Sequence, residues 1–217
     1  MAEPRKVAVL ISGRGTNMRA LVEQAGTYEV VLVASNKPEA TGLAWARDRG
    51  LNVWSRDSRG IDRAAFDAEL GDVIAAHNAG TIALAGYMRL LSPQFVERWR
   101  GRIVNIHPSL LPAFPGLHTH QRALAGGVKI HGTTVHFVTS QLDHGPIIIQ
   151  AAVPVLPSDD EDTLARRVLV QEHRIYPQAL RWLAENRVVF AVNDVVEIRG
   201  LDVPSNIGDQ YLLVPKE

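Results

Sequence analysis

The chain has 217 residues, of which 46% are hydrophobic and 21% are charged, the composition of a soluble globular protein. Its 23 Lys and Arg residues balance 23 Asp and Glu residues, so the formal net charge is zero. This balance argues against a nucleic-acid partner, which would favour a strongly basic surface. The absence of cysteine excludes disulfides and cysteine-based catalytic or zinc sites.

The sequence contains no recognisable targeting or membrane segment. No apolar run approaches the roughly 20 residues of a membrane span. The N-terminal stretch MAEPRKVAVLISG lacks the long apolar core and the cleavage site of a signal peptide. We therefore expect a cytoplasmic protein without a membrane partner.

The first half of the chain alternates short apolar strands with helices. We expect strands at 6–11, 29–35, 51–54, 81–85 and 103–107, and helices at 18–24, 41–49, 62–78 and 92–98. Short strands that are apolar on both faces and are separated by helices are typical of a parallel sheet. We therefore expect an α/β fold with helices on both faces of the sheet.

The second half departs from this alternation. A helix is expected at 119–125, followed by long strands at 129–138 and 146–155 that only a loop separates, so these two strands should pair antiparallel. Ser158 and Glu161 have capping-box spacing and predict a helix from there to about Ala184, which Pro177 should kink or divide. The sheet should thus be mixed but mostly parallel.

The C-terminal residues have the pattern of a small β ribbon. Strands are expected at 188–192, 195–199 and 211–214, and Asn193-Asp194 is a hairpin signal. No linker is long enough to separate independent domains. We therefore expect a single domain over residues 1–217, with residues 187–217 as a small C-terminal β extension.

A glycine loop (residues 12–17, SGRGTN) follows the first strand and precedes a helix, an arrangement that favours anion binding at the helix N-terminus. It is not a P-loop, and Met18 stands where a dinucleotide fingerprint needs its third glycine. Thr16 and Asn17 could donate hydrogen bonds to a phosphate monoester. The alternative is a tight turn in which Asn17 only caps the helix.

A polar pair ends the otherwise apolar strand at 103–107. Asn105 and His107 are two residues apart, so they share one face at the carboxyl end of the strand, where open α/β sheets bind ligands. An amide and an imidazole suit carbonyl chemistry, because the amide stabilises an oxyanion and the imidazole donates or transfers a proton. Asp143, in the loop between the two long strands, could hold the imidazolium; the alternative is a solvated turn residue.

The remaining histidines do not have metal-ligand spacing. His118 and His120 should lie in a loop beside the site, and His136, flanked by Val135 and Phe137, is interpreted as a supporting or core histidine. His131 occupies the same strand. We expect no metal site.

Seven segments between residues 6 and 185 resemble phosphoribosylglycinamide formyltransferases. They are SGRGTN, ASNKPEATGLAWAR, LAGYMRLLSP, NIHPSLLPAFPGLHTH, HGTTVHFV, LDHGP and QEHRIYP. The Asn-x-His-Pro-Ser-Leu-Leu-Pro and Asp-x-Gly-Pro motifs are shared with transfer-RNA formyltransferases and 10-formyltetrahydrofolate hydrolases. The glycine loop, the segment Gly116–Thr119 (GLHT) and the chain length favour the phosphoribosylglycinamide formyltransferases over these two other classes. The resemblance implies a Rossmann-like formyltransferase fold.

The resemblance also implies roles for individual residues. Asn105, His107 and Asp143 would be catalytic. The ribonucleotide contacts would be Gly15, Thr16, Asn17, Pro108 and Glu172, with the first three at the phosphate and Glu172 at the ribose. The folate contacts would be Arg63, Met88, Arg89, Leu90, Leu91, Thr139, Ser140, Gln141, Leu142 and Asp143. The Leu111–Pro112 peptide bond would be cis. Leu169 and Gly80 depart from the family pattern, where a polar residue and an aspartate are expected.

The activity implied is transfer of the formyl group of the co-substrate 10-formyltetrahydrofolate to the amine of 5'-phosphoribosylglycinamide in purine biosynthesis. Both partners are small molecules, neither a metal nor a covalent enzyme intermediate is required, and a monomer and a homodimer both stay open. Three alternatives remain: a 10-formyltetrahydrofolate hydrolase, a formyltransferase acting on another amine such as a sugar nucleotide, and a nucleotide-binding module without catalysis.

Overall fold

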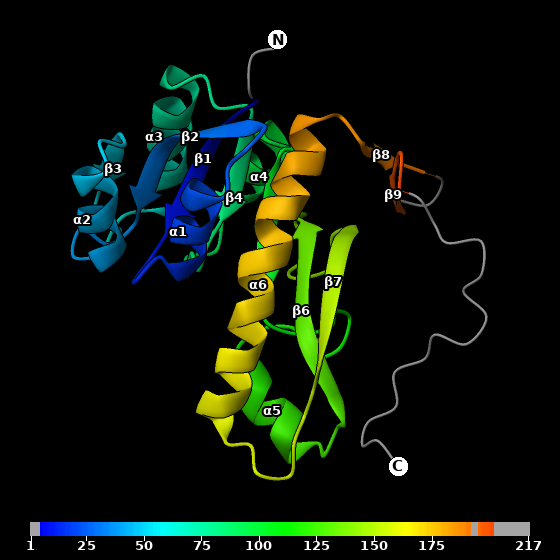
Figure 1. Cartoon of the computed structure of the whole chain (residues 1–217). Helices are drawn as coiled ribbons and strands as arrows, with labels where there is room; N and C mark the ends of the chain where they lie inside the picture. The colour runs from blue at the N-terminus through cyan, green and yellow to red at the C-terminus, as the bar shows by residue number, and fades with distance from the viewer. Residues whose placement is uncertain (1–4, 192–194, 202–217) are drawn as a thin grey trace.

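The computed structural model describes residues 5–191 and 195–201 (Figure 1). The first five strands are β1 (Arg5–Ile11), β2 (Tyr28–Ser35), β3 (Val53–Ser55), β4 (Thr81–Leu84) and β5 (Ile103–His107). They are followed by β6 (Ile130–Phe137) and β7 (Ile147–Pro154). The helices are α1 (Thr16–Glu23), α2 (Thr41–Asp48), α3 (Arg63–Ala76), α4 (Pro93–Arg98), α5 (Thr119–Ala125) and α6 (Glu161–Ala184). These elements agree with the predicted ones to within a few residues at each end.

Seven strands form one mixed sheet in the order β3-β2-β1-β4-β5-β6-β7. Neighbouring strands are parallel from β3 through to β5, whereas β6 is antiparallel to both β5 and β7. The predicted mixed, mostly parallel sheet is therefore confirmed. The chain winds outward from β1 in both directions, so the carboxyl ends of β1 and β4 flank a topological switch point, the usual ligand position in such sheets.

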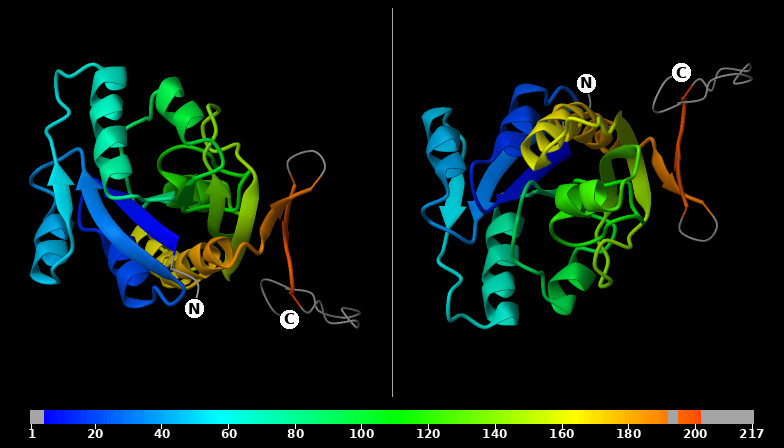
Figure 2. Two further views of the ribbon diagram at one scale, coloured as in Figure 1. Left: turned by 90° about the horizontal axis from the view of Figure 1, so that it is seen from above. Right: turned by 90° about the horizontal axis from the view of Figure 1, so that it is seen from below.

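Helices cover both faces of the sheet (Figure 2), and a large hydrophobic core lies on each face. Alternate residues of β1 divide between them, because successive strand side chains point to opposite faces. Val9 belongs to the core under α1, α2 and α6, and Leu10 belongs to the core under α3 and α4. Both are completely buried. Both faces of the sheet are thus covered, so a binding site has to lie at the strand ends or at the edges of the sheet.

Helix α6 starts later than the sequence pattern predicts. Its N-cap is Asp160, whose Oδ1 accepts the Thr163 N–H at 2.8 Å, while Thr163 Oγ1 accepts the Asp160 N–H at 2.9 Å. The predicted cap at Ser158 is therefore wrong by two residues. The physical reason lies in Asp159, which accepts the Leu156 N–H at 2.8 Å and so holds the preceding residues in a turn.

Pro177 does not divide α6, which runs unbroken from Glu161 to Ala184. A proline inside a helix leaves the carbonyl four residues earlier without its usual donor. Here that carbonyl, of His173, accepts a hydrogen bond from Gln24 Nε2 at 3.1 Å. A side chain beyond the end of α1 thus takes over the missing donor, and the helix stays continuous.

The C-terminal ribbon is described in part. Strands β8 (Val188–Phe190) and β9 (Val196–Ile198) pair antiparallel, as predicted. The ribbon lies beside β7, and the Phe190 ring packs on that of Phe137 with centroids 4.9 Å apart. The Asn193-Asp194 turn and the strand predicted at 211–214 lie outside the described residues. Among the described helices, none is both long and apolar enough to cross a membrane.

Candidate functional site

The structure brings the predicted catalytic residues together at the carboxyl end of β5. Strand pairing places Asn105 opposite His136 and His107 opposite Thr134 on β6. Asp143 reaches the same place from the loop between β6 and β7, with its Oδ2 3.5 Å from His107 Nδ1 and its Oδ1 3.9 Å from His136 Nε2. We call Asn105, His107, His136 and Asp143 the polar cluster.

His136 orients the Asn105 side chain. Its Nδ1 lies 2.8 Å from the Phe137 carbonyl oxygen and therefore carries the proton that this acceptor requires. Burial lowers the pKa of His136, so the ring stays neutral and Nε2 is an acceptor. The Asn105 amide group donates to that Nε2 at 3.3 Å. This bond fixes which end of the amide is the donor, and Nδ2 keeps a second hydrogen for another partner.

His107 has an acceptor at each ring nitrogen. Nε2 lies 3.1 Å from the Phe114 carbonyl oxygen, and Nδ1 faces the Asp143 carboxylate. A doubly protonated ring satisfies both acceptors, whereas a neutral ring satisfies only one. His107 is 6% exposed, so water cannot readily replace either partner. The geometry therefore suits an imidazolium held by a carboxylate.

The Asp143 loop is shaped by local backbone requirements. Asp143 adopts a left-handed conformation with φ of 52°, and its Oδ2 accepts the Gly116 N–H at 2.8 Å. At Gly145 a Cβ atom would lie 1.8 Å from the Phe137 carbonyl oxygen, so only glycine allows the loop to return against β6. The loop is thereby fixed beside the sheet, and Asp143 reaches the polar cluster instead of remaining a solvated turn residue.

Side chains from β6 and β7 hold the segment that follows His107. Thr133 Oγ1 donates to the His107 carbonyl at 3.0 Å, and Thr134 Oγ1 donates to the Ser109 carbonyl at 2.7 Å. Gln150 Nε2 donates to the Leu111 carbonyl at 2.9 Å. The Leu111–Pro112 peptide bond is cis, as the resemblance implies. Pro108, predicted at the ribonucleotide, lies half-buried in this segment.

The glycine loop presents backbone at the N-terminus of α1. Gly15 is the N-cap residue in the left-handed region, with φ of 69°, and it forms no side-chain cap. The loop is tied to α2 by the Gly42 N–H, which donates to the Gly13 carbonyl at 3.1 Å. The alternative in which Asn17 caps this helix is therefore wrong, because Asn17 is the second residue of α1.

Asn17 turns instead to the predicted ribose residue. Its Nδ2 donates to Glu172 Oε2 on α6 at 2.6 Å, and both side chains are buried. Burial raises the pKa of Glu172. Asn17 Oδ1 is also buried and has no hydrogen-bond partner in the described structure. Two predicted ribonucleotide contacts thus form a pair with unused hydrogen-bonding capacity.

The predicted folate residues divide between two loops. The 86–91 loop follows β4 beside the glycine loop, and its Met88 and Leu90 side chains are 65% and 55% exposed. Arg89 turns inward, where its guanidinium donates to the carbonyls of Ser58 and Ile61 at 3.4 and 3.3 Å. Residues 139–142 are exposed in the Asp143 loop, and Arg63 is exposed at the start of α3.

Two of the other histidines pack against each other beside the polar cluster. His120 and His131 contact each other, with 3.2 Å between Nδ1 of the first and Nε2 of the second. Burial lowers the pKa of His131 to about 4, so it is neutral near pH 7. In the part of the chain that the structure describes, no group of three or more His, Asp or Glu residues is placed to hold a metal ion.

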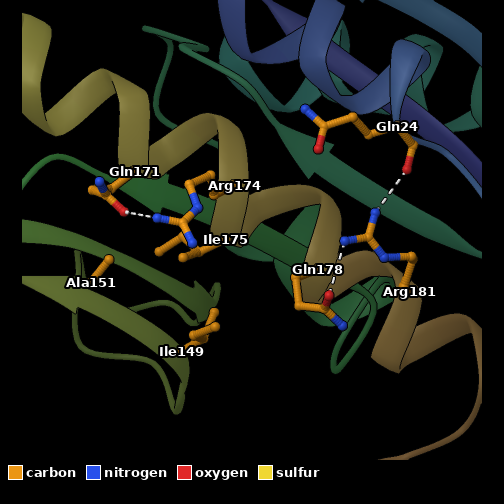
Figure 3. Close-up of a pocket in the computed structure, with 8 residues that line it drawn as sticks. All are labelled: Gln24, Ile149, Ala151, Gln171, Arg174, Ile175, Gln178 and Arg181. Carbon is orange, nitrogen blue, oxygen red and sulfur yellow. Dashed lines mark hydrogen bonds between the residues drawn. The ribbon is translucent and has the colours of Figure 1, made fainter.

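A pocket elsewhere on the molecule involves none of the predicted site residues (Figure 3). It lies between α6, β7 and the end of α1, and its lining is Gln24, Ile149, Ala151, Gln171, Arg174, Ile175, Gln178 and Arg181. Arg181 donates to the Gln24 carbonyl at 2.9 Å and to Gln178 Oε1 at 2.9 Å, while Arg174 donates to Gln171 Oε1 at 3.3 Å. Its arginines are thus engaged with neutral partners.

Comparison with known proteins decides the family. The formyl transferase sequence family matches residues 5–180. This chain belongs to the formyl transferase family. It is 46% identical over 187 residues to the phosphoribosylglycinamide formyltransferase of Escherichia coli K12, a match that covers 84% of this chain and 88% of that protein.

Two further members extend the comparison. The chain is 46% identical over 194 residues to the trifunctional purine biosynthetic protein adenosine-3 of Drosophila melanogaster. This match covers 86% of this chain and 14% of that longer protein. The crystal structure of glycinamide ribonucleotide transformylase 1 from Symbiobacterium toebii has a TM-score of 0.87 at 44% identity and covers 91% of this chain and 95% of that one. The Rossmann-like formyltransferase fold is therefore shown.

The sequence reasoning missed several supporting residues. Ser12, Asn36 and Ser58 are buried and hydrogen-bonded to one another beneath the 86–91 loop. Asp67 is buried on α3, where its Oδ2 accepts the Ser92 N–H at 2.5 Å. Polar residues at the carboxyl ends of β1 and β2 were a signal for the first two, whereas Asp67 looks like any helix-surface aspartate until the fold places Ser92 beside it.

Proposed function

We propose that this member of the formyl transferase family transfers the formyl group of 10-formyltetrahydrofolate to the amine of 5'-phosphoribosylglycinamide, a step of purine biosynthesis. The observation that carries the proposal is the polar cluster, in which an amide, a held imidazole and a carboxylate meet at the carboxyl end of β5. The family match supports the reaction type. The residues after 180 lie beyond the family match and have no part in the proposed chemistry.

The chemistry requires an oxyanion site and a route for one proton. The amine nitrogen attacks the formyl carbon, and the carbonyl oxygen becomes an oxyanion, which the second Asn105 amide hydrogen and His107 would stabilise. The carbon–N10 bond of the folate then breaks. The amine loses a proton and the folate nitrogen gains one, with Asp143 as the nearby carboxylate for the transfer. The nucleophile belongs to the substrate, so no covalent enzyme intermediate is needed.

His107 must exchange one partner to take part. In the free protein its Nε2 hydrogen is engaged by the Phe114 carbonyl, and its Nδ1 faces Asp143. An oxyanion is a stronger acceptor than a neutral carbonyl. We therefore expect substrate binding to displace the Phe114 carbonyl while the contact with Asp143 persists.

The two substrates would approach the polar cluster from adjacent loops. The glycine loop offers the amides of Gly15, Thr16 and Asn17 to the phosphate, and Glu172 faces the ribose. The 86–91 loop and residues 139–143 would hold the pterin, largely through backbone groups, with Arg63 toward the glutamate tail. The fold supports this division, because β1 and β4 are neighbours and end at the same edge.

The decisive experiment follows deformylation of 10-formyl-5,8-dideazafolate by absorbance, with and without 5'-phosphoribosylglycinamide. Turnover that requires the ribonucleotide is the expected result. Turnover without it would contradict the proposal in favour of the hydrolase. No turnover under either condition would also contradict it, and folate binding measured by calorimetry would then separate another amine acceptor from a binding module.

A further inference from the structure

One buried hydroxyl connects the two proposed half-sites. Ser12 is the first residue of the glycine loop, and its Oγ donates to Asn36 Oδ1 at 2.6 Å while accepting the Met88 N–H at 2.8 Å. The Ser12 N–H also donates to the Gly86 carbonyl at 3.1 Å. Ser12 therefore holds the 86–91 loop at two points, one through its main chain and one through its side chain.

The hydrogen bonds continue from Asn36 to a second loop. Asn36 Nδ2 donates to Ser58 Oγ at 3.3 Å, and the Ser58 N–H donates to the Asn36 carbonyl at 3.2 Å. The Ser58 carbonyl in turn accepts from the Arg89 guanidinium. Ser12, Asn36 and Ser58 are 7%, 6% and 9% exposed, so water is poorly placed to replace these bonds. We call these three residues the serine–asparagine network.

Tyr87 and Leu91 pack on the core under α3 and α4, but the Met88 backbone between them depends on this network because the Met88 and Leu90 side chains pack little. Met88 and Leu90 are mostly exposed, whereas the Met88 N–H is bonded to a buried side chain. Backbone groups, which would recognise the pterin in the proposed function, are therefore held by hydrogen bonds and not by packing of these side chains. The hydroxyl that holds the loop belongs to the segment proposed to bind the other substrate.

We infer that Ser12 is a positioning residue that sets the 86–91 backbone for the folate and fixes its place relative to the glycine loop. The inference rests on the proposed function. It concerns a residue that touches neither reacting group, so its effect should fall on folate binding and not on the chemical step.

Substitution of Ser12 tests the inference. Ser12→Ala leaves the Met88 N–H and Asn36 Oδ1 without their partner, and unpaired buried polar groups are costly. We expect the KM for 10-formyl-5,8-dideazafolate to rise about tenfold. kcat should fall less than threefold and the KM for the ribonucleotide should stay within twofold. Ser12→Thr keeps the hydroxyl and should restore the folate KM to within about threefold of wild type.

Ser35→Ala is the matched control. Ser35 is also a buried serine at the same edge of the sheet, and its Oγ makes one donor and one acceptor bond, both with Lys37 of its own turn. A general loss of stability would affect both variants, whereas loss of folate positioning would affect Ser12→Ala alone. An unchanged folate KM in Ser12→Ala, equal rises for both substrates, or the same pattern in Ser35→Ala would each overturn the inference.

A measurement without any ligand separates this inference from the proposed function. The Met88 amide should exchange with solvent at least tenfold faster in Ser12→Ala than in wild type, and its rate should not change in Ser35→Ala. If wild-type protein binds no folate, the proposed function fails while this exchange result still tests the loop. Unchanged Met88 exchange in Ser12→Ala would show that the hydroxyl does not hold the loop.

Discussion

The polar cluster and the glycine loop lie at the same edge of the sheet but are built in different ways. In the polar cluster, each side chain has a defined partner on another element, as with Asn105 on β5 and His136 on β6. In the glycine loop, the arrangement comes from backbone, with Gly15 in the left-handed region and the Gly13 carbonyl bonded to α2. Substitutions in the first should therefore remove chemistry, and substitutions in the second should change binding.

The largest effect should come from the polar cluster. We expect Asn105→Ala and His107→Ala each to lower kcat about 10²–10⁴-fold, because each removes an oxyanion donor or a proton-transfer group. Steady-state deformylation in the presence of the ribonucleotide measures this. His77→Ala, at the end of α3, is the control and should keep kcat within twofold. Activity within tenfold of wild type in both cluster variants would contradict the catalytic assignment.

His136 tests whether the partner of a catalytic side chain matters as much as the side chain itself. His136→Phe removes the acceptor for Asn105 and should lower kcat about 10–100-fold, the scale of an unpaired buried polar group. Both KM values should change less than threefold, since neither substrate would touch His136. His136→Gln offers an amide oxygen as a replacement acceptor and should recover part of kcat. Wild-type kcat in His136→Phe would show that Asn105 is oriented by other means.

The glycine loop should show a smaller effect of a different kind. At Gly15 a Cβ atom would lie 2.9 Å from Met18 Cε, and the left-handed backbone disfavours any L side chain. We therefore expect Gly15→Ala to raise the KM for the ribonucleotide about tenfold, with kcat nearly unchanged.

Gly13 provides the matched control in the same loop. A Cβ atom there would meet nothing within 4 Å, and the Gly13 backbone does not have a positive φ. Gly13→Ala should leave the KM for the ribonucleotide within threefold. If both alanine variants raise this KM equally, the conformation of Gly15 is not what prepares the loop. If Gly15→Ala lowers kcat as strongly as Asn105→Ala, the contrast between the two regions fails.

Sequence patterns predict the regular elements well because each pattern has a local cause. Residues 103–107 are predicted as a strand and β5 has those bounds, and the alternation along β1 separates the two cores. The cap of α6 was misplaced because Ser158 and Asp160 both have suitable partners three residues later. Asp159 decides between them through its bond to the Leu156 N–H, which sequence spacing does not reveal.

The candidate site was predictable where a residue's chemistry is unusual for its position. Asn105 and His107 interrupt an apolar strand, so they were visible in the sequence. Ser12 and Asp67 were not predicted, since their roles depend on Met88 and Ser92, which lie 76 and 25 residues away in the chain. Long-range hydrogen bonds of this kind follow only from the fold.

The smallest expected effect concerns Glu172, where binding and stability should oppose each other. Burial raises the pKa of this carboxyl in the folded protein, so the unfolded chain releases the proton first as the pH rises. The contribution of Glu172 to stability is thus complete below the unfolded pKa of about 4.3 and is lost as the pH rises toward the folded pKa. A buried carboxyl whose ionisation destabilises the fold is consistent with a role in binding, as the proposed ribose contact requires.

Glu172→Gln cannot ionise, and its amide oxygen can still accept the Asn17 hydrogen bond. We expect the Tm difference, variant minus wild type, to be about 2–4 °C larger at pH 8 than at pH 4.5. A change of about 1 kcal/mol in the free energy of unfolding produces a shift of this size in a protein of this length. The KM for the ribonucleotide should rise. Glu29→Gln, on the exposed face of β2, provides the baseline in the same buffers. A Tm difference that shrinks as the pH rises would mean that Glu172 stabilises the fold as a carboxylate, and the conflict between binding and stability at this position would then not exist.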